Sequence, residues 1–138
     1  WGDGMRSKHG INVHGFPNMF IVQPTQGAAL ISNVPHNLTE SGRTIAMMVK
    51  HALDNDKQQI EVTKEAEDAW IELLLSGQAR GGGVLGSPDC TPGYYNNEGQ
   101  PRAEGAALAV GYPQGPVAFF RYLDEWRNTG DFEGIEFS

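Results

Sequence analysis

The clearest pattern of hydrophobic and polar positions lies between residues 37 and 55 and predicts a helix. Its apolar residues follow the i, i+3, i+4, i+7 spacing of a single helix face: Ile45, Met48, Val49 and Ala52. Asn37 is a residue type that caps helix N-termini, and Glu40 completes a capping box three residues later. We therefore expect this helix to begin after Asn37 and to end near Asn55.

Two further segments show the same helical spacing. Thr63 is a suitable N-cap and Gly77 a suitable stop for one of them, whose apolar face is Ala66, Trp70, Leu73 and Leu74. Pro116 fits the first position of the other helix and Gly130 its end, and the apolar face is Phe119, Phe120, Leu123 and Trp126. These patterns predict helices over about 64–76 and 116–129.

Short apolar runs between the helices predict strands. The run at 19–22 is bounded by two prolines and is expected to be a buried strand, and 107–110 and 132–137 are shorter candidates. Residues 77–106 are rich in Gly and Pro and predict a long loop, of the kind that is commonly functional or disordered. The predicted order is β-α-α-loop-β-α-β, a mixed α/β arrangement.

Composition narrows the function classes. The 138 residues suffice for one domain, and a net charge of −7 disfavours nucleic-acid binding. No run approaches the ~18 apolar residues that a membrane helix needs. The single Cys90 favours a reducing compartment such as the cytoplasm. The chain begins at Trp1 without an initiator Met, so we expect an upstream portion to have been removed.

Several common site motifs are absent from the sequence. It contains no GxGxxG and no GxxxxGK[ST] turn, and its four histidines lack metal-ligand spacing, so no metal site is expected. Cys90 has no neighbouring base in the sequence that could activate it as a nucleophile. His36, which precedes the first predicted helix, is the only histidine that we consider as a candidate for a place near a reaction site. The acidic clusters are expected to be solvated helix faces: Glu65, Glu67, Asp68, Asp124 and Glu125.

The loop at 23–36 connects the first predicted strand to the first predicted helix, where α/β proteins often bind cofactors. Residues 26–29 are small enough for close approach to a flat ligand, Asn33 offers an amide, and Val34 offers a backbone N–H. Pro35 must lie where no N–H is needed. An ordinary strand–helix connection is the alternative interpretation.

A second candidate is the Tyr-Tyr-Asn-Asn sequence at 94–97 in the long loop. Two aromatic rings and two amides can cover a bound ring system and hydrogen-bond to its edges. Such a loop can become ordered when the ligand binds. The alternative is a turn with surface tyrosines.

Residues 1–6 read Trp-Gly-Asp-Gly-Met-Arg, and residues 14–20 read His-Gly-Phe-Pro-Asn-Met-Phe. This pair is similar to the W-x-D-G-x-R and G-F-P-N-L/M-F motifs in the C-terminal part of Baeyer–Villiger monooxygenases, flavoproteins that insert oxygen next to a ketone carbonyl. Residues 32–40 resemble the active-site loop of that family, and 119–134 its C-terminal helix and tail. Residues 90–99 resemble the corresponding segment of those family members that act on large cyclic or steroid-like ketones.

The resemblance implies a fold and cofactors. The chain would be the C-terminal segment of a two-dinucleotide-domain, Rossmann-like flavoprotein: three helices, a few short strands and a long loop. Residues 1–60 would end the FAD-binding domain with its active-site loop and helix. Residues 61–138 would hold the remaining helices, the long mobile loop and the closing strand. The parent would use FAD and NADPH, both bound mainly by protein outside this chain, to insert one atom of O₂ into a ketone.

The resemblance also assigns site residues, and none of them is catalytic. Asn33 and Val34 would lie against the flavin, and Tyr94 falls where many members place a Trp that contacts NADP. The substrate pocket would be lined by Leu30, Ile31 and Ser32. The fragment alone is expected to be inactive, neither retaining FAD nor oxidising NADPH, and to self-associate through faces that the remainder of the same chain would cover.

Two other functions remain open at this point. The first is a stand-alone α/β binding or interaction module that presents the loop at 77–106 to a partner. The second is a fragment of a related flavin N-hydroxylase or S-oxygenase.

Overall fold

The computed structural model describes residues 5–23, 25–28, 32–77, 91–92 and 110–138. Its elements, in chain order, are α1 (Val34–Asp54), β1 (Ile60–Val62), α2 (Lys64–Ser76), α3 (Pro116–Thr129) and β2 (Ile135–Phe137). Over these described ranges the fold is a small α/β unit of three helices and two short strands. The α/β class and the three helices are as predicted, whereas the strands agree only in part. None of its helices is long and apolar enough to cross a bilayer.

Helices α2 and α3 begin and end where the sequence predicts. The Thr63 side chain accepts a hydrogen bond from the Ala66 N–H at 3.2 Å, and Gly77 is the C-cap of α2. Pro116 is the first residue of α3, and Gly130 ends that helix in the left-handed conformation, with φ of 77°. For these two helices the caps named from residue type alone, Thr63, Gly77 and Gly130, are therefore confirmed.

Helix α1 begins a turn earlier than predicted. Asn33, and not Asn37, is the N-cap, since its side chain accepts a hydrogen bond from the His36 N–H at 3.0 Å. Pro35 lies in the first turn, where a missing N–H costs nothing because it would have no helical partner. Asn37 is inside the helix and 4% exposed. The predicted end at Asn55 is confirmed.

The predicted strand at 19–22 is wrong. Phe20 makes only an isolated bridge to Asn12, the Ile21 N–H donates to the Ile11 carbonyl at 2.8 Å, and Val22 is 52% exposed. The buried apolar residues of this region are Ile11 and Val13 instead. The segment folds back on the chain before it, and within the described residues no third strand pairs with β1 or β2.

The strand pair β1–β2 is antiparallel, with Ile60 opposite Phe137 and Val62 opposite Ile135. β2 confirms a strand within 132–137, whereas β1 was missed because three residues with two apolar positions give little signal. The strand candidate at 107–110 lies outside the described residues except for Val110, which is not in a strand. The predicted loop at 77–106 also lies outside them, apart from 77 and 91–92.

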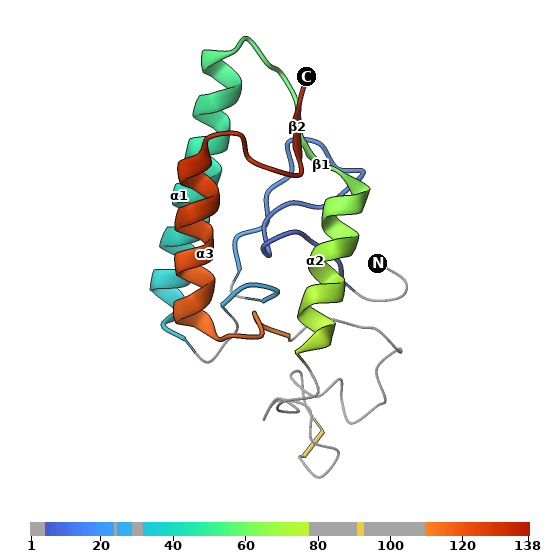
Figure 1. Cartoon of the computed structure of the whole chain (residues 1–138), viewed down its shortest axis with the longest axis vertical. Coiled ribbons are helices and arrows are strands. Elements are labelled where there is room, and N and C mark those ends of the chain that lie inside the picture. Colours follow the sequence, from blue (N-terminus) through green and yellow to red (C-terminus); the bar gives the residue numbers. More distant parts are fainter. Residues whose placement is uncertain (1–4, 24, 29–31, 78–90, 93–109) are drawn as a thin grey trace.

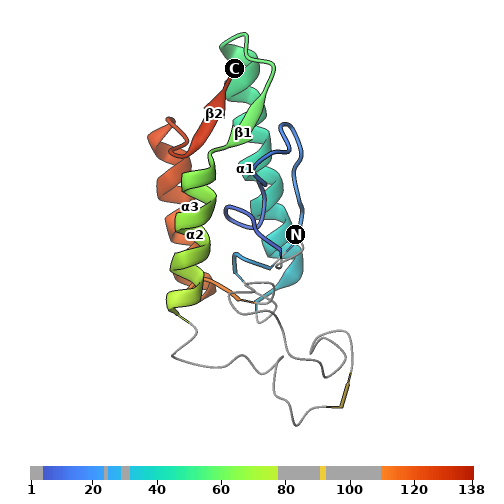
Figure 2. The same ribbon diagram turned by 90° about the vertical axis from the view of Figure 1, so that its right-hand side faces the viewer.

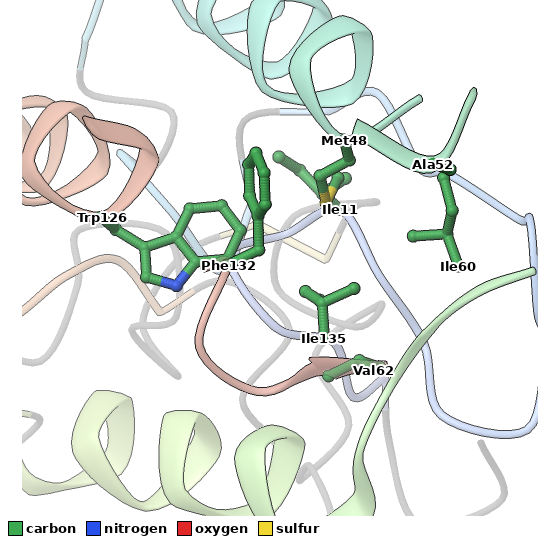
Figure 3. Packing of buried hydrophobic residues seen from close by; sticks show 8 residues of the cluster. All are labelled: Ile11, Met48, Ala52, Ile60, Val62, Trp126, Phe132 and Ile135. Carbon is green, nitrogen blue, oxygen red and sulfur yellow. The ribbon is translucent and has the colours of Figure 1, made fainter. Parts of the chain in front are cut away.

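Helices α1 and α3 lie side by side, and residues 5–23 and 25–28 lie between this pair and α2 (Figure 1, Figure 2). The first core cluster joins α1, the strand pair and α3 around Ile11 (Figure 3); its buried residues are Ile11, Met48, Ala52, Ile60, Val62, Trp126, Phe132 and Ile135. The second lies between α2 and α3; its buried residues are Ala28, Trp70, Ile71, Leu74, Phe119 and Leu123. The predicted helix faces therefore point into these cores.

His9 connects the two clusters. Its ring contacts the rings of Trp70, Tyr122 and Trp126 edge-on, at centroid distances of 4.7, 5.3 and 4.8 Å. The imidazole is 3% exposed. Burial, and secondarily the Lys8 ammonium, lowers the pKa of His9 well below its ordinary value of 6.5. His9 is therefore a neutral part of the core.

We expect the free energy of unfolding to fall as the pH drops below about 6.5, with a slope approaching 1.4 kcal/mol per pH unit from this group. Because the folded pKa of His9 is depressed, the unfolded chain binds a proton in this window and the folded chain does not. The contribution is present above the unfolded pKa and is lost as the pH falls. Urea unfolding at several pH values measures it, and His9→Gln should flatten the slope. An unchanged slope in His9→Gln would contradict the assignment.

Candidate functional site

The predicted site residues that the structure describes are Ser32, Asn33 and Val34, which together form the start of α1. Asn33 and Val34 are exposed, and Ser32 is partly buried. The Ser32 hydroxyl donates to the side-chain oxygen of Asn37 at 3.0 Å, so it ties the approaching loop to the second turn of the helix. The N-terminus of α1 therefore fixes the positions of these three residues.

The first turn of α1 leaves one backbone donor free. Pro35 has no N–H, the His36 N–H donates to the Asn33 side chain, and the Asn37 N–H donates to the Asn33 carbonyl at 3.1 Å. Within the described ranges, the Val34 N–H has no hydrogen-bond acceptor. The first turn contains no acidic residue. This end can therefore donate to an electron-rich acceptor, and the helix dipole favours one there.

Residues 26–28 are not available to a ligand, which corrects the prediction for the stretch 26–29. Gln26 is 0% exposed; its amide donates to the Met5 carbonyl at 2.7 Å and accepts from the Ser7 hydroxyl. At Gly27, the ideal Cβ position lies 2.9 Å from the Phe119 ring. These residues connect the N-terminal segment to α2 and α3. Ala29 lies outside the described residues, as do Leu30, Ile31 and Tyr94.

His36 lies on the surface beside the start of α3. Its ring meets the Phe120 ring edge-on, with 4.5 Å between centroids. This contact packs the first turn of α1 against the apolar side of α3. In the part of the chain that the structure describes, no group of three or more His, Cys, Asp or Glu side chains could hold a metal ion.

Glu67 corrects the prediction of a solvated acidic face on α2. It is 6% exposed, and its carboxylate accepts a hydrogen bond from the His14 backbone N–H at 2.9 Å. The Arg6 guanidinium lies 3.6 Å from the same carboxylate and also pairs with Asp68. Glu67 therefore holds the segment around residue 14 against α2.

Arg127 positions α1 against α3 and was not singled out from the sequence. Its side chain is 1% exposed. Its guanidinium donates to the Glu40 carboxylate at 2.7 Å, to the Thr44 hydroxyl at 3.2 Å and to Asp124. The signal was present, because residue 127 follows Leu123 by four positions and so falls on the apolar face of α3. A buried cation on that face requires acceptors from a neighbouring helix.

Comparison with known proteins agrees with this architecture. No family model matches the chain. It is 37% identical over 137 residues to the FAD-binding monooxygenase hmp7 of Hypomyces subiculosus, covering 99% of this chain and 22% of that protein. It is 35% identical over 136 residues to Baeyer–Villiger monooxygenase 4 of Dietzia sp., covering 98% of this chain and 21% of that protein.

Solved structures of monooxygenases share the fold, among them the following two. The polycyclic ketone monooxygenase of Thermothelomyces thermophila superposes with a TM-score of 0.79 at 29% identity, over 97% of this chain and 21% of that one. A steroid monooxygenase bound to NADP superposes with a TM-score of 0.74 at 17% identity, over 99% of this chain and 23% of that one, a likeness of fold alone.

The fold is thus that of the C-terminal segment of a large flavin monooxygenase. The chain is homologous to this segment of Baeyer–Villiger and related FAD-binding monooxygenases, which confirms the resemblance seen in the sequence. It spans about 22% of the length of the curated relatives it matches.

Proposed function

We propose that this chain is the C-terminal segment of an enzyme that uses FAD and NADPH to insert one oxygen atom of O₂ next to a ketone carbonyl, giving an ester or lactone. The observation that carries the proposal is homology over 99% of the chain to FAD-binding and Baeyer–Villiger monooxygenases. No such relation supports the stand-alone module or the N- and S-oxygenase alternatives. Residues 1–60 complete the FAD-binding domain, and 61–138 form the closing part of the polypeptide.

In this proposal the start of α1 faces the flavin and the substrate. The Val34 N–H has no acceptor among the described residues, Val34 itself is exposed, and no acidic side chain lies in the first turn, so this end suits an electron-rich ring edge. Bound flavin supplies the oxidation chemistry. The chain supplies the donor at Val34, the amide of Asn33 beside it, and a fixed helix end. Leu30, Ile31 and Ser32 line the ketone pocket, and Tyr94 contacts NADP.

The remainder of a longer polypeptide would cover apolar side chains that are exposed here. The largest are Phe16, Val22, Leu53 and Val117, which are 52–71% exposed. Without that cover they favour self-association of the isolated chain. The isolated chain is expected not to retain FAD. The single Cys90 favours the cytoplasm as its compartment.

The function is tested on the polypeptide that contains this sequence together with whatever precedes it. We expect it to carry FAD, to oxidise NADPH when a cyclic ketone is added, and to transfer isotopically labelled oxygen from O₂ into a lactone. Oxidation of an amine or sulfide in place of the ketone would favour the N- or S-oxygenase. If the protein that the source gene encodes has about this chain's size and carries no FAD, the proposal is overturned in favour of the binding module.

The role of the Val34 N–H is tested by a matched pair of variants in that polypeptide. Val34→Pro removes the free donor, and a proline is tolerated at the first helical position; Val34→Ala keeps the N–H and removes the side chain. Loss of one charge-stabilising donor costs about a hundredfold in turnover at comparable sites. We therefore expect turnover to fall by about this factor in Val34→Pro and to change little in Val34→Ala. Equal loss in the two variants would assign the effect to the side chain.

A further inference from the structure

The buried face of α1 changes from polar to apolar along the helix. In the half that begins at the candidate site, the buried residues are polar: Asn37, Ser41 and Thr44. In the other half they are Met48 and Ala52, which belong to the first core cluster. Spacings of three and four residues place all of them on one face of the helix. Polar contacts therefore matter most in the half of α1 that carries the candidate site.

Arg127 supplies such contacts from the neighbouring helix α3 (Figure 1). Its guanidinium donates to the carboxylate and to the backbone carbonyl of Glu40, at 2.7 and 3.4 Å, and to the Thr44 hydroxyl at 3.2 Å. Because hydrogen bonds are directional, contacts with side chain and backbone together fix the helix both along and about its axis. Glu40 follows Val34 by six residues, which is about 9 Å along a helix. The bridge is therefore close enough to fix where the first turn lies.

This ion pair has a cost that stability alone does not explain. The Arg127 side chain is 1% exposed, and its Nε is a buried donor without an acceptor in the described part of the chain. An unsatisfied buried donor is unfavourable, and a well-packed apolar pair is often as stable as a buried ion pair. Apolar packing is non-directional, however, and permits small shifts of one helix along another. An ion pair here is thus better suited to fixing geometry than to stabilising the fold.

We propose that Arg127 is a positioning residue for oxygenation, which acts through Glu40 to hold the Val34 N–H at the flavin edge. The inference rests on the proposed function, because only there does the start of α1 face the flavin. A misplacement of about 1 Å at a reacting centre can lower turnover by about a hundredfold. Arg127 is buried between the helices and touches neither cofactor nor substrate, so its loss should change turnover more than ketone binding.

The test uses variants of the intact polypeptide that separate geometry from stability. Glu40→Leu combined with Arg127→Met replaces the ion pair by apolar side chains and should restore the stability that Arg127→Met alone loses. We expect kcat of this double variant to remain about tenfold below that of the unaltered polypeptide. The KM for a cyclic ketone should change by less than about twofold. Arg43→Met, which removes an exposed cation near the same Asp124 carboxylate, should leave kcat unchanged.

Amide hydrogen exchange provides a readout that is independent of turnover. In the double variant, the amides of 37–45 should exchange faster and those of 46–54 should not, because only the first half of α1 relies on the bridge. A second combination adds Val34→Pro to the double variant. We expect a further loss of kcat of less than about twofold relative to Val34→Pro alone, because the donor through which Arg127 acts is already absent.

A double variant that regains both stability and full kcat would overturn the inference, since Arg127 would then be structural only. Unchanged exchange in 37–45, or a full additional loss on top of Val34→Pro, would also overturn it. If the double variant does not fold, Thr44→Val keeps the ion pair and removes one acceptor, and an unchanged kcat in Thr44→Val would then contradict the positioning role. Failure of the proposed function is seen separately, as an unaltered polypeptide that carries no FAD or oxidises no ketone.

Discussion

Replacing Arg127 by methionine is expected to lower the free energy of unfolding by about 3 kcal/mol, the low end of the cost of removing one partner from a buried ion pair. The guanidinium is 1% exposed and bridges α3 to α1 through Glu40 and Thr44. Methionine fills most of the volume but satisfies neither acceptor. The Glu40 carboxylate, 14% exposed, would remain partly buried without a cation. Chemical denaturation of the chain, with an unchanged denaturant slope, measures the loss.

Arg43→Met is the matched control, since Arg43 approaches the same Asp124 carboxylate at 3.6 Å. Both of those side chains are more than half exposed, so this pair is expected to contribute less than about 1 kcal/mol. The two variants remove the same charge and differ in burial. If Arg127→Met cost no more than Arg43→Met, the bridge between the helices would not be a major source of stability.

The helices could be predicted because their information is local. Spacing of apolar residues located three helix faces, and the caps Thr63 and Gly130 follow from residue type. The start of α1 was missed because Asn33 and Asn37 are both good caps, and the sequence alone does not decide between them. The outcome favours the earlier residue, which places a proline in the first turn and buries Asn37 among neighbouring side chains.

The errors concern residues whose partners are distant in sequence. Glu67 is buried because the His14 N–H reaches it from 53 positions away, and no pattern within α2 indicates this. The run at 19–22 has the composition of a strand but lacks a neighbouring strand, which only the tertiary fold supplies. The start of α1 was a candidate site from residue chemistry alone, and only the family resemblance named the flavin as what it would contact.

Gly10→Ala is expected to lower the free energy of unfolding by about 2–3 kcal/mol, because it combines left-handed backbone strain with a steric clash. Gly10 has φ of +74°, and an added Cβ would lie 2.3 Å from the Thr25 carbonyl oxygen. That oxygen belongs to backbone next to the buried Gln26, so it cannot move without disturbing the contact between the N-terminal segment and α2. Thermal or urea unfolding of the variant measures the cost.

Gly15→Ala separates the two causes. Gly15 has φ of +83° but nothing within 4 Å of an added Cβ, so this variant carries only the left-handed strain, about 1 kcal/mol. The difference between the two variants is therefore the steric part, which the close approach of residues 10 and 25 imposes. Equal losses would mean that the backbone near Thr25 yields easily. The Trp70 indole donates a hydrogen bond to the Gln26 carbonyl at 2.9 Å, which indicates a rigid junction between the N-terminal segment and α2. Equal losses would show that this junction is less rigid than the hydrogen bond indicates.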